Sequence, residues 1–257
     1  MRAHVSAAST AAPSSVRSLS VVLPCWNEVH AVGEVIEGLL EVRRGAPYPM
    51  EVVIVDDGST DGSAALLHRL ASRCDAVRVV RHGDNRGYGA ALRTGFAAAR
   101  GGHVLYMDAD GQLDPRDLPR VVALLDRYDA VSAYRAPRRD GPLRRAYGLG
   151  WTSLTNALLR HEVRDINCAF KVFPRWFVAE AELRSTGALL GAELLSKARR
   201  RGLRVGQVGV RHRPRVSGRS TGADPNVIGR AFGELIALMR EPRALRQAGV
   251  AVRSRSR

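Results

Sequence analysis

Short apolar segments alternate with amphipathic segments through the first half of the chain. The apolar segments are rich in valine, isoleucine and leucine, as is typical of buried strands, and cover residues 18–26, 50–58, 76–82, 103–110 and 130–135. Between them, apolar side chains recur at helical spacing over residues 28–44, 61–73, 88–100 and 115–127. Strands that alternate with helices predict βαβ units and a mostly parallel sheet that helices cover on both faces.

The second half of the chain is less regular. Residues 142–160 predict a helix with Tyr147, Trp151 and Leu158 on one stripe. The remaining pattern indicates extended segments at 166–173 and 203–213, with helices at 174–182, 190–202 and 225–240. We expect one α/β domain over 18–240, between a disordered tail at 1–17 and a basic tail at 241–257.

Charge is distributed unevenly along the 257 residues. Residues 1–134 carry a formal net charge of −2, whereas residues 135–257 carry +17. An arginine-rich composition with only two lysines explains the choice of arginine but not this asymmetry. The basic half predicts an anionic partner, which is nucleic acid, a phospholipid surface or a phosphate-bearing substrate. Nucleic acid is disfavoured, because only 5% of residues are aromatic and no RNA-stacking motif or recognition helix is present.

Composition also limits the cellular setting. No apolar run is long enough for a transmembrane helix, and residues 1–17 lack the apolar stretch of a secretory signal. Cys25, Cys74 and Cys168 are far apart and odd in number, which favours reduced thiols in the cytoplasm over disulfides or a zinc site. We expect Cys25 to be a small buried residue and not a nucleophile, because no histidine is placed by the sequence to activate it.

The strongest candidate chemistry follows the strand at 103–110. Alternate residues of an extended segment face the same side, so Asp108, Asp110 and Gln112 converge after a slight turn. Two carboxylates and an amide oxygen suit Mg²⁺ or Mn²⁺ shared with substrate phosphates. A lone Asp-x-Asp is more often a loop or helix cap, but at the end of a buried strand two carboxylates repel each other unless a cation joins them.

Two further loops carry candidate binding groups. In "DDGSTDG", aspartate and serine side chains cap the next helix, or one carboxylate accepts hydrogen bonds from a ribose or base. Both hold if Asp56 anchors the loop and Asp57 faces a nucleotide. The segment "NRGYGAALRTGF" at 85–96 is similar to a phosphate-binding glycine loop. Its glycine spacing differs from the dinucleotide fingerprint, and the first strand has no glycine turn, which argues against a dinucleotide cofactor.

Together these motifs resemble a known family. The order "VVLPCWNE", "VVIVDDGSTDG", "NRGYGAALRTGF" and "YMDADGQLDP" is similar to family 2 glycosyltransferases with the GT-A fold. Within them, the chain most resembles the polyprenyl-phosphate sugar transferases of the dolichyl-phosphate mannose synthase group. The resemblance continues through "AYRAP", "RDINCAFKVF", "RVSGRST" and "NVIGRAFGELIAL" and covers roughly residues 18–240. It implies a single Rossmann-like GT-A domain with acceptor-side helices near its C-terminus.

The resemblance also implies a role for each matching residue. The nucleotide of a GDP-mannose or UDP-hexose donor would meet Pro24, Trp26, Glu28, Val55 and Asp57, with Trp26 stacking where the family usually has tyrosine. Mg²⁺ or Mn²⁺ and the diphosphate would be held by Asp108, Ala109, Asp110 and Gln112, and the acceptor phosphate by Arg135, Arg215 and Ser220. Ala169 stands where the family often has glycine, and Thr221 where it often has lysine; loss of that lysine removes one phosphate contact unless Arg219 substitutes.

The expected reaction is a metal-dependent, inverting sugar transfer in which Asp110, Arg135, Arg215 and Asp165 are the candidate catalytic residues. A lipid phosphate acceptor is already anionic and needs arginines, with Arg213 and Arg219 as further candidates. A hydroxyl acceptor on a glycan, protein or small molecule would instead need a carboxylate base, either Asp165 or Glu193. A residue such as Asp165 is more often structural, pairing with a nearby arginine or capping a turn. Glu193 lies at the start of a helix, where a carboxylate interacts favourably with the helix dipole and needs no catalytic role.

A membrane surface is the other expected partner. Residues 142–160 and the last helix are the expected membrane contacts. Tyr147 and Trp151 suit a lipid interface, and Arg144, Arg145 and Arg160 suit anionic headgroups. A core-packing helix at 142–160 is an equal alternative. We therefore expect a peripheral protein at the cytoplasmic face of the membrane, with or without a membrane-protein partner.

Overall fold

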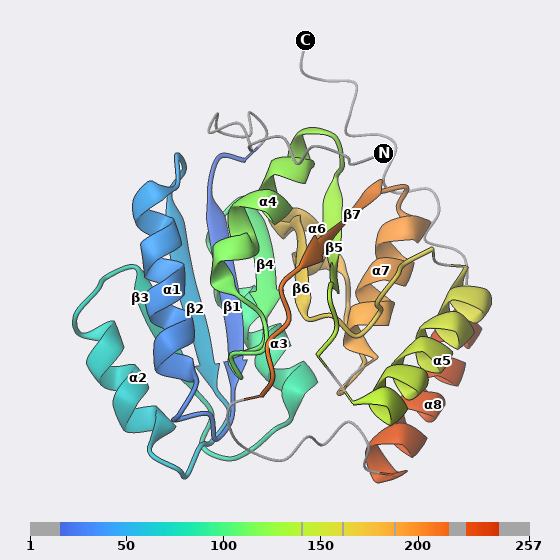
Figure 1. The fold of residues 1–257 in the computed structure, drawn as a ribbon, viewed down its shortest axis with the longest axis horizontal. Helices are drawn as coiled ribbons and strands as arrows, with labels where there is room; N and C mark the ends of the chain where they lie inside the picture. Colours follow the sequence, from blue (N-terminus) through green and yellow to red (C-terminus); the bar gives the residue numbers. More distant parts are fainter. Residues whose placement is uncertain (1–15, 140, 161, 188, 216–224, 242–257) are drawn as a thin grey trace.

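A seven-stranded sheet forms the centre of the molecule (Figure 1). The computed structural model describes residues 16–139, 141–160, 162–187, 189–215 and 225–241. Its strands are β1 (Leu19–Cys25), β2 (Met50–Asp56), β3 (Val77–Arg81), β4 (His103–Met107), β5 (Ala130–Arg135), β6 (Phe170–Pro174) and β7 (Val205–Val210). They lie in the order β3-β2-β1-β4-β6-β5-β7, and only β6 runs antiparallel to its neighbours. The expected mostly parallel α/β architecture is confirmed.

Helices cover both faces of this sheet. They are α1 (Val32–Gly45), α2 (Ser63–Ala71), α3 (Tyr88–Ala98), α4 (Leu118–Ala123), α5 (Pro142–Leu159), α6 (Arg175–Glu180), α7 (Leu190–Arg200) and α8 (Pro225–Arg240). In Figure 1, α1 and α4 lie in front of the sheet and α3 lies behind it. All seven residues of β1 are buried, as expected for a central strand that is covered on both sides.

Two predicted helices differ from the structure. The helix expected at 115–127 is three shorter pieces in the structure. The α-helix α4 is preceded by the 3₁₀ turn η1 (Pro115–Asp117) and followed by the 3₁₀ turn η2 (Leu124–Asp126). Pro119 lacks the N–H donor that a continuous helix starting at Pro115 would need at that position. The helix expected from residue 28 begins only at Val32, because the carbonyl of Glu28 first closes a turn by accepting the N–H groups of Ala31 and Val32.

The strand order reverses between β1 and β4. The chain passes from β1 outward to β2 and β3, then returns to β4 on the other side of β1. Ligands of open α/β sheets bind at the carboxyl ends of the strands where the order reverses in this way. The β1–β4 border is therefore where the fold predicts a ligand.

Helices α5 and α8 lie together at the opposite side of the molecule from α1 and α2 (Figure 1). The rings of Trp151 on α5 and Phe232 on α8 meet edge to face, with centroids 5.2 Å apart. Among the described helices, none is both long and apolar enough to cross a bilayer. The boundaries expected for the two tails stay predictions, since residues 1–15 and 242–257 lie outside the described residues.

Candidate active site

The register of the strands gathers the candidate residues at one edge of the sheet. Cys25 at the end of β1 pairs with Asp56 at the end of β2, and the N–H of Asp57 donates to the carbonyl of Cys25 at 2.8 Å. Residues 26–28 therefore lie beside the 57–59 loop. Asp108 follows the next strand across the β1–β4 border.

The loop after β4 carries two carboxylates, those of Asp108 and Asp110, that are largely shielded from solvent. Tyr88 Oη donates a hydrogen bond of 3.0 Å to Asp108, and Asp110 accepts the N–H of Gln112 at 3.0 Å across a turn in which Gly111 has φ of 75°. Burial, followed by repulsion from Asp110, raises the pKa of Asp108 to about 7. A divalent cation bound by both carboxylates would relieve the repulsion that Asp110 exerts on Asp108.

The tip of β1 is joined to this acidic loop by an arginine. Arg215 pairs with Glu28, and its other terminal nitrogen lies 3.6 Å from Asp110 Oδ2. Burial raises the pKa of Glu28 to about 7 even though the charge of Arg215 opposes the shift. The structure thus brings together three of the predicted site residues, Glu28, Asp110 and Arg215, which lie far apart in the sequence.

Other residues of the β1 tip have different surroundings. Trp26 is 48% exposed, so its indole is available as a stacking surface. Pro24, Val55 and Ala109 are buried, and a contact of any of them with a nucleotide stays a prediction. Burial raises the pKa of the Cys25 thiol to about 12, which keeps it protonated and confirms that it is a small buried residue.

The carboxylate of Asp57 is hydrogen-bonded to the protein's own residues 82–87 in this structure. Its Oδ1 lies 2.6 Å from His82 Nδ1 and accepts the N–H of Arg86, while Oδ2 accepts the N–H of Gly87 at 2.8 Å. Asp56 anchors its own turn as expected, since it accepts the N–H of Ser59 at 3.0 Å. A direct contact from Asp57 to a nucleotide stays a prediction.

The glycines at 87 and 89 pack against protein and do not form an open phosphate cradle. The N–H of Gly89 donates to the carbonyl of Thr186 at 2.9 Å, and a Cβ on Gly89 would lie 2.5 Å from the carbonyl oxygen of Ser185. The resemblance of this segment to a phosphate loop is therefore not supported by its contacts. Close backbone approach explains the glycine instead.

A second polar centre lies where β5 and β6 meet. Arg135 Nε and one terminal nitrogen donate to the two oxygens of Asp165 at 2.6 and 2.9 Å, and both side chains are buried. Despite burial, the hydrogen bonds and charge of Arg135 hold the pKa of Asp165 below its usual value. Asp165 therefore pairs with an arginine, which was one of its two expected roles.

The remaining candidates are dispersed. Glu193 is buried and accepts N–H groups from Arg184 and Ser185 while it pairs with Lys197 at 2.7 Å, so it lies within the protein framework. Arg213 pairs with Asp114 at 2.8 Å and with Glu34 at 2.9 Å. Three candidates, Ser220, Arg219 and Thr221, lie outside the described residues, as does the side chain of Arg144.

Sequence analysis missed two members of the site. Tyr88, which bonds Asp108, stood inside the supposed phosphate loop. Lys171 is fully buried on β6. Its charge and that of Arg135 partly oppose the rise in the pKa of Asp108 that burial and Asp110 cause. The available signal was a lysine in the otherwise apolar segment "INCAFKVF", in a chain that uses arginine almost everywhere else.

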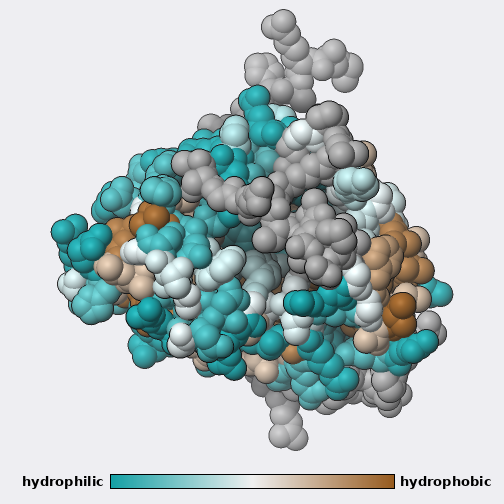
Figure 2. All heavy atoms as spheres, turned by 90° about the horizontal axis from the view of Figure 1, so that it is seen from below, coloured by the Kyte–Doolittle hydropathy of each residue, from teal (hydrophilic) through white to brown (hydrophobic). Residues whose placement is uncertain are grey.

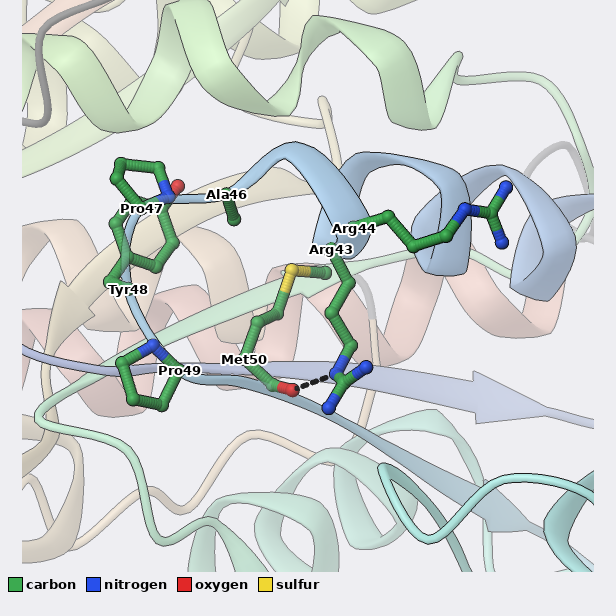
Figure 3. Close-up of a pocket in the computed structure, with 7 residues that line it drawn as sticks. All are labelled: Arg43, Arg44, Ala46, Pro47, Tyr48, Pro49 and Met50. Carbon is green, nitrogen blue, oxygen red and sulfur yellow. Dashed lines mark hydrogen bonds between the residues drawn. The ribbon is translucent and has the colours of Figure 1, made fainter.

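Two surface hollows differ in their relation to this site. One of about 460 Å³ lies at the α1–β2 connection, with Arg43 Nε donating to the carbonyl of Met50 (Figure 3). It lies at the start of β2, the opposite end from Asp56. The other, of about 400 Å³, is lined by Asp114, Pro137, Arg139, Arg211, His212, Arg213 and Pro214. It adjoins the acidic loop, since the N–H of Arg213 donates to the carbonyl of Gln112 at 2.7 Å.

Comparison with known proteins agrees with this geometry. The chain is 31% identical over 223 residues to glycosyltransferase AglD of Haloferax volcanii, which covers 81% of this chain and 35% of that protein. It is 31% identical over 176 residues to dodecaprenyl-phosphate galacturonate synthase of Rhizobium johnstonii, covering 66% and 52% of the two chains. It is 33% identical over 176 residues to undecaprenyl-phosphate 4-deoxy-4-formamido-L-arabinose transferase of Pseudomonas syringae, covering 65% and 50%. The chain thus spans about a third to a half of the length of these relatives.

Solved structures give the same fold. Glucosyl-3-phosphoglycerate synthase from Mycobacterium tuberculosis, crystallised with Mn²⁺, UDP and phosphoglyceric acid, superposes with a TM-score of 0.69 at 23% identity. The match covers 88% of this chain and 80% of that one, which confirms the expected GT-A fold. The model of the family described as glycosyl transferase family 2 matches residues 20–180. The chain therefore belongs to glycosyl transferase family 2.

Proposed function

We propose that this protein transfers a sugar from a nucleotide-diphosphate sugar to a polyprenyl phosphate, with inversion at the anomeric carbon and with Mg²⁺ or Mn²⁺ as cofactor. The observation that carries the proposal is the position of the Asp108–Asp110 pair. It lies at the β1–β4 border, within electrostatic range of Arg135 and 3.6 Å from Arg215. Acidic groups for a cation and basic groups for phosphates meet there.

The metal proposal rests on the chemistry of the donor set. Asp110 opposes the ionisation of Asp108, and Gln112 adds an amide oxygen on the same loop. Bound there, the cation would neutralise the charge that develops on the departing nucleoside diphosphate. The Mycobacterium tuberculosis neighbour was crystallised with Mn²⁺ or Mg²⁺ and UDP, which supports a divalent cation for this fold.

Each remaining residue has a proposed task. Trp26 offers a flat exposed face for the base or ribose, and Glu28 accepts hydrogen bonds from their polar groups. Arg135 and Arg215 bind phosphate oxygens of acceptor and donor. The nucleotide base and the sugar are left open between a GDP-mannose and a UDP-hexose donor.

A phosphate acceptor agrees with the contacts of the two candidate bases. Polyprenyl phosphate is anionic at neutral pH and attacks without losing a proton to the protein. A hydroxyl acceptor would need a carboxylate base, but Asp165 is bound by Arg135 and Glu193 by Lys197 and two backbone N–H groups. Two of the named relatives are polyprenyl-phosphate enzymes, which favours the same acceptor class.

We further propose that α5 and α8 rest on the membrane that holds the lipid. Phe232, Ile236 and Met239 are spaced three and four residues apart on α8 and are all exposed, while Tyr147 and Leu158 are exposed on α5. Figure 2, which views the molecule from below, shows an apolar area at its right edge, on the side where Figure 1 places α5 and α8. Exposed Arg145 and Arg160 on α5 suit anionic headgroups at the cytoplasmic face.

A labelled-donor assay tests the proposed function. The full chain is incubated with a panel of radiolabelled nucleotide sugars, Mg²⁺ or Mn²⁺ and a short polyprenyl phosphate, with Asp110→Asn as the control. We expect label from one donor to enter the organic phase and Asp110→Asn to abolish that transfer. If the donor binds but no label enters lipid in the presence of either metal, the proposed acceptor is wrong.

A further inference from the structure

Both lysines of this arginine-rich chain are buried. Only two of its 40 basic residues are lysines, and Lys171 and Lys197 are 1% and 6% exposed. Lys197 lies on α7 and pairs with Glu193 at 2.7 Å. Lys171 lies on β6, in register with Tyr106 of β4 and Ser132 of β5, and therefore stands in the middle of the sheet beneath the candidate site.

The ammonium of Lys171 is bound by main-chain carbonyls. It donates to Ile166 at 3.0 Å and to Cys168, and it lies 5.8 Å from the ring centroid of Tyr106. The space is closed from the other side by Gly191, where a Cβ would come within 3.5 Å of Nζ. A compact ammonium with three donors fits this enclosure better than the planar fork of an arginine.

The two carbonyls belong to the turn that carries Asp165. The N–H of Cys168 donates back to the carbonyl of Asp165 at 3.3 Å, so the ammonium closes a turn over residues 165–168. Asp165, at the start of this turn, accepts two hydrogen bonds of 2.6 and 2.9 Å from the guanidinium of Arg135. The contacts thus run without a break from Lys171 through the turn to Arg135.

We propose that Lys171 is a positioning residue that sets the orientation of Arg135 toward the acceptor phosphate by fixing the turn over residues 165–168. The inference rests on the proposed function for the identity of the acceptor, but the geometric relation of Lys171 to Arg135 does not. Removing the ammonium leaves two buried carbonyls without their donor, and the turn relaxes to find others. Asp165 and Arg135 then move with it.

Transfer kinetics give the first test. Lys171→Met keeps an unbranched side chain of similar length without the ammonium, and Lys197→Met is the matched control, because it makes the same change at another buried, hydrogen-bonded lysine. We expect Lys171→Met to lower kcat/KM for polyprenyl phosphate by about 10- to 100-fold while nucleoside diphosphate affinity stays within about threefold. Lys171→Arg should not restore the rate, whereas Lys171→Gln, which keeps an N–H donor, should lose less.

A double-mutant cycle then asks whether Lys171 acts through Arg135. Adding Lys171→Met to Arg135→Gln should cost little more than Arg135→Gln alone, because the group that Lys171 positions is already absent. Fully additive losses, or equal losses in Lys171→Met and Lys197→Met, would show that Lys171 serves only general stability and would overturn the proposal.

A spectroscopic readout keeps the test independent of the acceptor. The ¹⁵N-labelled guanidinium Nε–H of Arg135, assigned by its absence in Arg135→Gln, should exchange slowly with solvent in the wild type because Asp165 binds it. We expect faster exchange in Lys171→Met and no change in Lys197→Met. If lipid transfer fails in the wild type but this difference is seen, the positioning role stands and only the acceptor is wrong; an unchanged Arg135 signal in folded Lys171→Met or Lys171→Gln overturns the inference.

Discussion

Burial raises the pKa of some acidic side chains of this site, whereas pairing with an arginine lowers the pKa of another. Asp108 and Glu28 have pKa values raised to about 7, first by burial. Asp165 is also buried, but Arg135 more than offsets that effect and lowers its pKa. The first two carboxyls are therefore poised to change charge near neutral pH, whereas Asp165 stays ionised as a fixed partner.

Cation binding should depend on pH for this reason. The folded-state pKa of Asp108 lies above its ordinary value of 3.8, so the metal-free protein holds an extra proton there that a cation must displace below about pH 7. Mn²⁺ affinity should rise by about tenfold per pH unit up to about pH 7 for one displaced proton and then level off. Calorimetric titration between pH 5.5 and 8 measures this, and a constant affinity across that range would contradict it.

The same shifts make a prediction for stability without metal. Because Asp108 and Glu28 have raised folded-state pKa values, the folded protein binds more protons than the unfolded chain between about pH 4 and 7. These two groups should therefore make the free energy of unfolding fall as pH rises through that window. Urea titrations of wild type and a Glu28→Gln variant should show a shallower fall in the variant; identical slopes would be evidence against the shift at Glu28.

The Arg135–Asp165 pair should behave as a buried structural pair. Asp165→Asn leaves the buried guanidinium without its counter-charge, which should lower the free energy of unfolding by about 3–5 kcal/mol. Glu41→Gln, which breaks an exposed 2.7 Å pair with Arg116, should cost less than about 1 kcal/mol. Chemical denaturation compares the two, and an Asp165→Asn protein of unchanged stability but no transfer activity would favour Asp165 as a catalytic base.

At the scale of elements, the start of α3 is fixed by a loop far along the chain. Gly89 meets the backbone of residues 185–186 so closely that a Cβ would lie 2.5–2.8 Å from its atoms. The same loop is held to α8, because Thr186 donates to Glu234 through its N–H and its hydroxyl at 2.8 and 2.7 Å. The segment that carries Tyr88 and the C-terminal helix are thus tied to one another.

Gly89→Ala and Gly33→Ala form a matched pair, since each glycine is the second residue of its helix. The first change forces backbone apart and should cost about 1–3 kcal/mol of stability. At Gly33 the nearest atom to a new Cβ is 3.7 Å away, so that change should be neutral or stabilise by about 0.4–1 kcal/mol. Thermal unfolding distinguishes them, and equal melting temperatures would refute the close contact at Gly89.

The elements also show which parts of the structure the sequence predicts. Runs such as residues 19–25 were identifiable because a strand covered on both faces must be apolar throughout. The antiparallel direction of β6 was not, because it depends on how α5 returns the chain to the sheet. Within the site, the Asp108–Asp110 spacing is local and can be read from the sequence, whereas the contact of Arg215 with Glu28 joins residues far apart in the sequence and arises only from tertiary packing.

At the scale of the whole molecule, the uneven charge and the apolar face of α5 and α8 belong to the same half of the chain. The +17 half includes both helices as well as Arg135 and Arg215. A protein that collects a lipid phosphate from a bilayer needs both an apolar contact and a basic one.

Vesicle binding tests this arrangement. Ile236→Ser and Met239→Ser each remove an exposed apolar side chain from α8 and should weaken binding to vesicles with anionic lipid by about 3- to 10-fold. Trp176→Ser, at a 51% exposed residue on α6, is the control and should leave binding unchanged. Flotation assays measure the affinities, and equal losses in all three variants would place the membrane contact elsewhere.

The central claim is that the acceptor is a lipid phosphate, and one comparison tests it most directly. The wild-type protein is given its labelled donor and divalent cation with either polyprenyl phosphate or the matching polyprenol, which has the same chain and a hydroxyl in place of the phosphate. We predict that label enters the lipid only with polyprenyl phosphate, because in the proposed site Arg135 and Arg215 bind the phosphate, whereas both candidate bases for a hydroxyl, Asp165 and Glu193, are engaged by basic side chains. Equal transfer to polyprenol would contradict the proposal and would identify a hydroxyl-directed enzyme.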